Sequence, residues 1–321
     1  MKQLLLITFL FSNTLYAQII PFNGKLLDHK TKEPIAFAHI QFKNSNIGVS
    51  TTEDGKFKLV IEKKLLNSEV FISCLSYKDT LVIANQIYNK DFYLQPKTVQ
   101  LKEVVIEKYE AKKVTIGTIK GKKKTRHLHR QDTTMIAQFI TGNKINSSIN
   151  YLEKVTLKFT DKIINQSKIR IRIYDRDSIS GAPLNDLLSE SIIININNTQ
   201  KKYEVDFADF FVEVPEDGFF VAIEKLIIPM NRCFIAPIEK STYPRYTSEF
   251  NKKKESKDSE NSKLLSFEKY RDEVTSYAPV VYLSDKKEKH IDFGNLYSLN
   301  SNKWEVYKIG YMLPMEIILS N

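Results

Sequence analysis

Apolar residues recur at every second position in short runs of this chain, a pattern that predicts β-strands and not helices. In the run IAFAHIQFK, small and apolar residues share one face of an extended strand while polar residues take the other. Runs of this kind follow one another from Ile19 to about Lys108, separated by turn-forming stretches such as DHKTKEP and EDG. About six to eight strands with no convincing helix predict a small antiparallel β-sandwich.

The same alternation of apolar and polar residues returns from about residue 131 to the end of the chain. In KIRIRIYD the isoleucines are expected to point inward and the alternate residues outward; the outward set is Lys168, Arg170, Arg172 and Tyr174. The run GFFVAIEKLII is heavily apolar, and APVVYLSD, KWEVYK and LPMEIILS follow it. Together these runs predict a second, jelly-roll-like β-sandwich.

The predicted fold class is therefore all-β, with two antiparallel β-sandwich domains joined by a basic linker. The domains span residues 18–108 and 131–321, and the linker spans residues 109–130, where Lys and Arg dominate. A polar stretch at about residues 248–275 cannot bury apolar surface, so we expect it to be a mobile insertion in the second domain.

Residues 1–17 have the layout of a cleavable signal peptide. A positive start precedes an apolar stretch that is too short to span a membrane, and Ala17 supplies the small residue at the cleavage site. The sequence therefore predicts an exported protein with no transmembrane span, located in the periplasm, associated with the outer membrane or on the cell surface.

The formal net charge of +10 raises the question of a nucleic-acid partner. Export argues against nucleic acid, and so does the concentration of positive charge between Lys108 and Arg130. A run of this kind is typical of a solvated linker. The alternative is contact with an acidic membrane surface or a polyanionic glycan.

The stretch NGKLLDHKTKEPIAFAHIQFKNSNIGVSTTEDGKFKLVI carries a recognisable pattern of turn and strand residues. The pattern residues are Gly24, Asp28, Thr31, Glu33, Pro34, Ile35, Gly48, Thr51, Asp54, Gly55 and Phe57. With the later stretch LQPKTVQLKEVVI, this segment resembles the carboxypeptidase regulatory-like domain, a transthyretin-like β-sandwich that also precedes the plug of outer-membrane TonB-dependent receptors. The resemblance implies a non-catalytic module and covers about 90 residues at the N-terminus.

Peptidase activity does not follow from that family name. A zinc peptidase needs a His and a Glu three positions apart plus a distant His, and no histidine of this chain is followed by Glu at that spacing; the histidines are His29, His39, His127, His129 and His290. Glu53, Asp54 and Gly55 are instead expected to close a hairpin, with Gly55 at positive φ and Phe57 pointing into the core.

Two constellations have spacings that metal ions use. His127 and His129 could share a metal if their segment is extended, but their Arg and Lys neighbours disfavour a cation and favour a solvated linker. Asp175 and Asp177 with Ser178 could form a calcium loop, or they could be the polar residues of an ordinary hairpin connection.

Hydrolytic chemistry has one candidate set of carboxylates. Asp206 and Asp209 with Glu213 could form a glycosidase pair, or they could be the solvent face of strands on which acidic residues alternate with Phe and Val. The chain has no Gly-x-Ser-x-Gly nucleophile motif and no glycine-rich phosphate loop.

Cys74 and Cys233 could pair after export, but they fall in different predicted domains, and Cys74 sits in an apolar run as a core residue would. Recognition of a partner would depend on exposed aromatic residues. The candidates are Tyr174, Tyr203, Tyr243, Tyr246, Trp304 and Tyr307.

These features lead to the prediction of a non-enzymatic exported cell-envelope protein whose β-sandwich modules bind a partner protein or glycan at the outer membrane. The sequence assigns no catalytic, metal or cofactor-binding residue, implies no cofactor, and leaves the binding residues unknown. Two alternatives stay open: a glycan-active hydrolase with carboxylates in the second sandwich, and an accessory subunit of an outer-membrane transporter.

Overall fold

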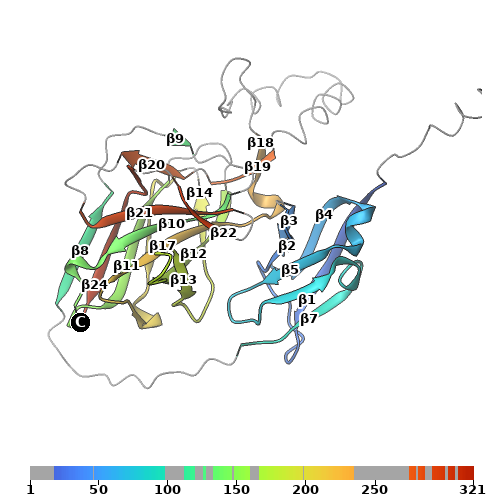
Figure 1. Ribbon diagram of the computed structural model, residues 1–321, viewed down its shortest axis with the longest axis horizontal. Helices are drawn as coiled ribbons and strands as arrows, with labels where there is room; N and C mark the ends of the chain where they lie inside the picture. The colour runs from blue at the N-terminus through green and yellow to red at the C-terminus, as the bar shows by residue number, and fades with distance from the viewer. Residues whose placement is uncertain are drawn as a thin grey trace, which may run out of the picture. The chain divides into compact units, whose positions relative to one another are not determined.

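A computed structural model of the chain divides into two compact units (Figure 1). The first unit holds strands β1 to β7 and the second holds β8 to β24. The structure describes residues 18–45, 47–97, 112–119, 126–127, 133–146, 148–159, 166–197, 199–234, 275–279, 281–285, 291–300, 303–307 and 310–321.

The first unit consists of two β-sheets. One sheet has the order β4-β1-β7 and the other the order β3-β2-β5-β6. Their strands are β1 (Ile19–Asp28), β2 (His39–Phe42), β3 (Gly48–Ser50), β4 (Lys56–Glu62), β5 (Glu69–Ser73), β6 (Thr80–Ile83) and β7 (Asp91–Leu94). All pairings are antiparallel except that of β1 with β7, which is parallel and departs from the purely antiparallel sandwich expected from the sequence.

Alternate residues of both sheets form one apolar core. Phe22 packs against Phe42 and Phe57 with ring centroids 5.4 and 5.3 Å apart, in the tilted geometry that aromatic pairs prefer. Cys74 is buried in the same core, as its apolar run predicted. The all-β prediction is confirmed for this unit.

The turn at Glu53 to Gly55 differs from the hairpin expected there. Gly55 does have positive φ, +75°, and Phe57 is buried, both as predicted. However, β3 and β4 belong to different sheets, so the turn carries the chain from one sheet to the other. The reason is that β4 pairs with β1, and the amide of Leu26 donates to the carbonyl of Gly55 at 2.9 Å, which fixes the turn against β1.

Two buried polar residues of the regulatory-like pattern hold other turns in place. The Asp28 carboxylate accepts hydrogen bonds from the amides of Lys30 (2.6 Å) and Thr31 (2.9 Å) and from the hydroxyl of Tyr77 (2.9 Å). The Thr51 hydroxyl accepts from the amide of Ala38 at 2.8 Å and donates to a backbone carbonyl at 2.7 Å. These residues therefore serve the fold, since each satisfies backbone groups that would otherwise be buried without partners.

In its described residues the second unit is a larger sandwich with a seven-stranded and a five-stranded sheet, against the eight strands that a jelly roll has in total. The first sheet contains β10 (Thr133–Thr141), β12 (Gln166–Arg176), β13 (Pro183–Asp186), β14 (Ile192–Asn197), β17 (Gly218–Lys225), β21 (Phe293–Asn300) and β22 (Lys303–Val306). The second contains β8 (Lys113–Thr118), β11 (Tyr151–Lys158), β15 (Lys202–Asp206), β16 (Val212–Glu213) and β24 (Met315–Ser320).

Buried isoleucine, valine and leucine side chains alternate along the central strands of both sheets, as on Ile169, Ile171 and Ile173 of β12. Gln138 of β10 adds a polar tie, because its Oε1 accepts from the amide of Leu313 at 2.9 Å, just before β24 begins. The strand pairings within this unit are antiparallel, as predicted.

The remaining elements are short. Two small sheets pair β18 (Arg232–Phe234) with β19 (Thr275–Tyr277), and β20 (Tyr282–Asp285) with β9 (Arg126–His127) and β23 (Tyr311–Met312). The described helical turns are η1 (Lys63–Asn67), η2 (Ala84–Gln86), η3 (Gly142–Lys144), η4 (Ala208–Phe210) and η5 (Pro229–Asn231). Within the described residues, no helix is long and apolar enough to cross a membrane.

The structure differs from the predicted linker at residues 109–130. Residues 113–118 form β8, which pairs along its whole length with β24, and residues 126–127 form β9. The alternation of Val114 and Ile116 with polar residues is a strand signal that the surrounding lysines obscured. The predicted signal peptide at 1–17 lies outside the described residues, as does nearly all of the predicted insertion at 248–275, where only Thr275 begins β19.

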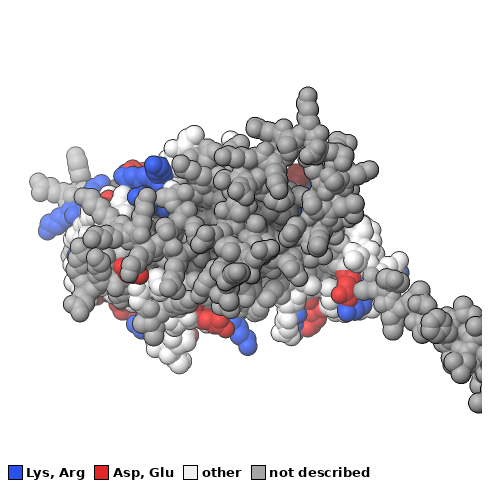
Figure 2. Space-filling model, turned by 90° about the horizontal axis from the view of Figure 1, so that it is seen from above, with Lys and Arg blue, Asp and Glu red and all other residues white. Residues whose placement is uncertain are grey.

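Opposite charges are interspersed on the described surface (Figure 2). Exposed pairs include Lys43 with Glu69, Lys56 with Asp54, and Lys202 with Glu204. Such exposed ion pairs contribute little to stability. The positive net charge is therefore not gathered into one basic patch on the described part of this view.

Replacing Asp28 with Asn tests the turn described above. The hydrogen bond from the Thr31 amide, and then that from Tyr77, stabilise the charged carboxylate and lower the pKa of Asp28 below its usual 3.8. Because the folded state binds this proton more weakly than the unfolded state, the stabilisation is present above pH 3.8 and is lost as the pH falls through the lowered pKa. At pH 7 we expect Asp28→Asn to cost about 1–3 kcal/mol, seen as faster hydrogen exchange in peptides from residues 18–97.

Asp91→Asn is the matched control, since Asp91 is exposed on β7 of the same unit. Equal exchange rates in the two variants at pH 7, or a difference that persists well below pH 3, would contradict the assignment.

Candidate functional site

Strand β12 is buried on both faces, which corrects the solvent-facing position predicted for Arg170, Arg172 and Tyr174. The exposed fractions of the Arg170 and Arg172 side chains are 1% and 15%, and that of Tyr174 is 7%. The register explains the difference, because Arg170 lies opposite Glu224 on β17 and Tyr174 lies opposite Asp186 on β13. Cross-strand neighbours on one face interact directly, so the arginines meet carboxylates there.

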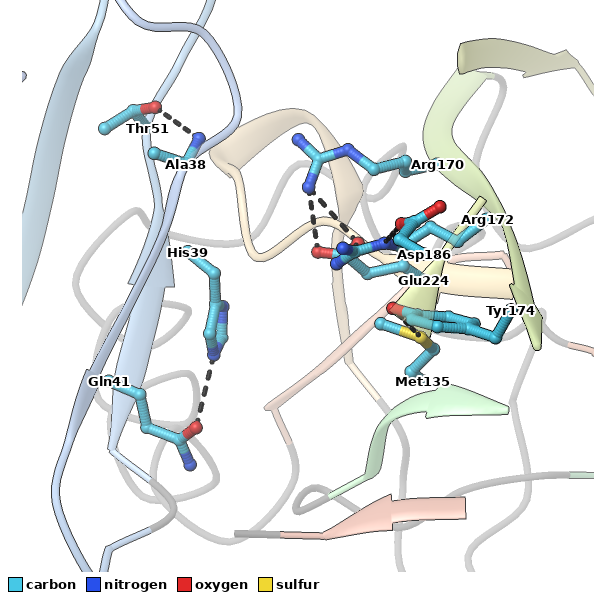
Figure 3. A network of polar contacts seen from close by, with 10 residues as sticks. All are labelled: Ala38, His39, Gln41, Thr51, Met135, Arg170, Arg172, Tyr174, Asp186 and Glu224. Atoms are coloured by element: carbon cyan, nitrogen blue, oxygen red, sulfur yellow. Dashed lines mark hydrogen bonds and ion pairs between the residues drawn. The ribbon is translucent and has the colours of Figure 1, made fainter. Parts of the chain in front are cut away.

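We call Arg170, Arg172, Asp186 and Glu224 the charged cluster (Figure 3). Nη1 of Arg170 donates to both carboxylate oxygens of Glu224, at 3.1 and 3.2 Å. Nε of Arg172 donates to Oδ2 of Asp186 at 2.6 Å, and its Nη1 donates to Glu224 at 3.5 Å. The cluster thus ties three strands of the seven-stranded sheet together through charge-assisted hydrogen bonds.

Burial and charge act in opposite directions on the members of this cluster. Burial raises the pKa of Asp186 above its usual value, although the Arg172 guanidinium partly opposes that change. Burial also works against the charge of Arg172, but its anionic neighbours hold the pKa of Arg172 above the usual value. Burial raises the pKa of Tyr174 as well, so this phenol stays neutral. At neutral pH the guanidinium of Arg172 is therefore a permanent cation held between two carboxyl groups.

Next to the charged cluster, the same face of the sheet carries one aromatic side chain on each of five strands. We call these residues the aromatic face: Phe139 on β10, Tyr174 on β12, Phe220 on β17, Tyr297 on β21 and Trp304 on β22. Met135, Ala137, Ala182, Ala222 and Leu299 pack among them. The charged cluster and the aromatic face meet at Tyr174, whose ring centroid lies 5.2 Å from the guanidinium carbon of Arg172.

The rings of the aromatic face are held mostly edge to face. Tyr174 and Trp304 lie 5.9 Å apart with their planes at 75°, and Phe220 and Tyr297 lie 5.4 Å apart at 87°. The hydroxyl of Tyr174 donates to the sulfur of Met135 at 3.6 Å. This packing fixes the orientation of each ring. The rings of Phe220, Tyr174 and Tyr297 are buried, whereas those of Phe139 and Trp304 are only partly buried.

Phe139 needs two glycines in order to lie against the sheet. A Cβ atom on Gly294 would come within 2.3 Å of the Phe139 ring, and one on Gly218 would come within 2.7 Å of it. The guanidinium carbon of Arg176 lies 5.0 Å from the centroid of this ring. The glycines therefore make room for a ring that supports an arginine at the end of β12.

The proposed calcium ligands do not converge. Asp175 accepts from the amide and side chain of Asn185, at 2.6 and 2.9 Å. Asp177 accepts from the amide of Ile179 at 2.8 Å and from the hydroxyl of Ser180 at 3.0 Å. Both carboxylates thus serve the connection between β12 and β13, as the hairpin interpretation held. Within the residues that the structure describes, no three His, Cys, Asp or Glu side chains are grouped to hold a metal.

The carboxylates considered for hydrolysis, those of Asp206, Asp209 and Glu213, are exposed and lie in three different elements. Asp206 accepts from the amide of Ala208 at 2.9 Å, Glu213 accepts from Asn150 at 3.2 Å, and Asp209 lies in η4. The structure instead brings together Asp186 and Glu224, which the sequence interpretation missed.

Other sequence candidates have structural roles or lie outside the described residues. The Tyr203 hydroxyl is buried in the connection from β14 to β15, where it accepts from the amide of Asn197 at 2.8 Å. His127 lies in β9 and Cys233 in β18, with side chains that are not described, and His129, Tyr243 and Tyr246 fall outside the described residues. Trp304 and Tyr307 are half-buried.

Comparison with known proteins identifies the first unit. Residues 22–106 match the family model described as the CarboxypepD_reg-like domain. The N-terminal segment is therefore a carboxypeptidase regulatory-like domain, as the resemblance implied. No curated protein matches the chain.

Among solved structures, a Bacteroides uniformis protein described as a candidate carbohydrate-binding protein is similar to this chain at 11% identity, with 82% of this chain and 97% of that chain covered and a TM-score of 0.18. A likeness this weak carries no inference about the ligand of this chain.

Removing Glu224 tests the charged cluster. Glu224→Ala leaves two buried guanidinium groups without their shared carboxylate, and breaking a buried ion pair in this way costs about 3–5 kcal/mol. We expect the second unit of this variant to unfold at a correspondingly lower urea concentration. The fluorescence of Trp304 reports the unfolding. Glu204→Ala is the control, because Glu204 pairs with Lys154 and Lys202 on the exposed side of the five-stranded sheet. Equal midpoints for the two variants would show that the cluster does not hold the sheet.

Proposed function

We propose that this protein is a non-enzymatic binding module that holds a glycan on the aromatic face of its second unit. The observation that carries the proposal is the partial exposure of Phe139 and Trp304 on the same face of the seven-stranded sheet as the buried rings of Tyr174, Phe220 and Tyr297. Sugar rings stack on aromatic rings through their C–H faces, and binding sites combine such apolar surface with a few placed polar groups.

The polar groups of Tyr297 and Trp304 support a glycan ligand. Neither the hydroxyl of Tyr297 nor the indole nitrogen of Trp304 makes a hydrogen bond to another described residue, so both are available to a ligand hydroxyl. A protein partner is the competing ligand class, since the exposed Ile179 and Leu184 lie in the neighbouring β12–β13 connection and strand. The experiment below separates the two classes.

Binding suits the described carboxylates better than hydrolysis does. A glycosidase acid must reach the leaving oxygen of its substrate, but Glu224 is only 4% exposed and both Asp186 and Glu224 are engaged by Arg172. The carboxyl groups of the charged cluster therefore support the sheet beneath the aromatic face.

We also propose a cellular location for this protein. We place the protein in the cell envelope after export, on the strength of the signal-like residues 1–17. A role as accessory to an outer-membrane transporter is the variant suggested by the regulatory-like domain, which also precedes the plug of TonB-dependent receptors.

A glycan array followed by titration calorimetry on the full chain tests the proposed function. We expect Trp304→Ala to lower the affinity for a glycan found on the array by about tenfold or more, because truncating an aromatic anchor of a binding site costs at least about 1.4 kcal/mol. Trp304→Phe should recover part of that loss, since it keeps a stacking ring.

Tyr93→Ala is the matched control, because Tyr93 is an aromatic residue of the first unit that is 41% exposed. Glycan binding that Trp304→Ala leaves unchanged would contradict the proposal. An empty array together with capture of an envelope protein would assign the face to a protein partner.

A further inference from the structure

We propose that the glycan bound by the aromatic face is acidic, and that Arg176 binds its carboxylate or sulfate group. This inference rests on the proposed function and adds the chemical class of the ligand. It follows from the position of Arg176 at the end of β12, where an exposed guanidinium lies over an aromatic ring of the same face.

Arg176 has no anionic partner within the described part of the chain. Its recorded contact is with the ring of Phe139, 5.0 Å from the guanidinium carbon. A cation stacked on a ring gains about 0.5–1 kcal/mol at an exposed site, and the stacking restricts the side chain without using its hydrogen-bond donors. The guanidinium thus presents a fixed fork of donors, the geometry that binds carboxylate and sulfate in pairs of parallel bonds.

The acidic residues nearest in sequence are engaged elsewhere. Asp175 binds Asn185 through both carboxylate oxygens. Asp177 binds the amide of Ile179 and the hydroxyl of Ser180, and the first of these bonds lowers the pKa of Asp177. Asp186, on the adjacent strand, is occupied by Arg172 and the amide of Leu188. Each carboxylate close to Arg176 along these two strands therefore has other partners.

The guanidinium of Arg176 and the hydroxyl of Tyr297 both lie beside Gly181. A Cβ atom built on Gly181 would lie 3.3 Å from Nη2 of Arg176 and 3.5 Å from the hydroxyl of Tyr297. The missing side chain leaves a space flanked by a cation and a phenol. With the indole N–H of Trp304, the free polar groups of the face are mainly donors, so they select a ligand rich in acceptor oxygens.

An acidic peptide fits this face less well than an acidic sugar. Peptides commonly bind to sheets by adding a strand to a free edge, but Arg176 lies on β12 and Phe139 on β10, and each of these strands is paired on both sides. Their backbones have no free row of hydrogen-bonding groups to offer. At Arg176 and Phe139, recognition therefore uses the ring and the guanidinium, which match the C–H face and the anionic group of a uronic acid or a sulfated sugar. Within the described residues β22, which carries Trp304, is an edge strand paired with β21, so strand addition there is the alternative that the test separates.

The test compares two pairs of ligands, all titrated into the full chain by calorimetry: oligogalacturonate with its neutral methyl ester, and a sulfated galactan oligosaccharide with its desulfated, neutral form. We expect the charged member of at least one pair to bind about tenfold or more tightly than its neutral form, as a charge-assisted bond predicts. Arg176→Gln should remove that preference, so that the charged and the neutral form bind with similar affinity. Arg176→Lys should keep part of it, because the charge remains while the fork is lost.

The outcomes separate this inference from the proposed function. Binding of neutral glycans that depends on Trp304, with no preference for charge and no effect of Arg176→Gln, would overturn the acidic ligand and leave the proposed function intact. Failure of every glycan on the array and in these titrations would overturn both. Tighter binding of poly-glutamate than of any glycan, abolished by Arg176→Gln, would show that the partner is an acidic protein segment.

Discussion

The second unit depends on one buried electrostatic interaction, the meeting of Arg170 and Arg172 with Glu224 and Asp186 on one face of the seven-stranded sheet. Ions removed from water are costly unless paired with good geometry, so this cluster constrains the register of β12 against β17 and β13. A slip of one residue would turn every charge to the opposite face, among the isoleucines. The same register sets Tyr174 beside Phe220, which places the aromatic face next to the cluster.

The polar residues of the two units have different roles. In the carboxypeptidase regulatory-like domain, the pattern residues stabilise turns: Asp28 and Thr51 bind backbone groups, and Gly55 supplies a positive φ. In the second unit, arginines, carboxylates and aromatic residues gather on one face of a sheet, and Arg176, Tyr297 and Trp304 keep polar atoms available. We therefore propose that the second unit binds the ligand, while the pattern residues of the first unit stabilise its turns.

Period-two alternation was enough to predict the all-β fold, the two sandwiches and the buried positions of Phe57 and the β12 isoleucines. It failed where a strand is buried on both faces, because arginines on alternate positions resemble a solvent face until the carboxylates that pair with them are known. Glu224 within the apolar run GFFVAIEK was the available signal, since a charge in a fully buried strand needs a partner. Phe139 and Gly181 gave no such signal, because their roles depend on residues far along the chain.

Trp304 is the only tryptophan of the chain and therefore a direct probe of the aromatic face. Its fluorescence and its quenching by acrylamide can be followed while oligogalacturonate or a sulfated galactan oligosaccharide is titrated into the intact protein. If a sugar stacks on this face, the emission of Trp304 will shift with saturation and its quenching will fall at the same ligand concentration. A glycan that binds by calorimetry while both signals stay constant would contradict the account, since the ligand would then lie away from the aromatic face.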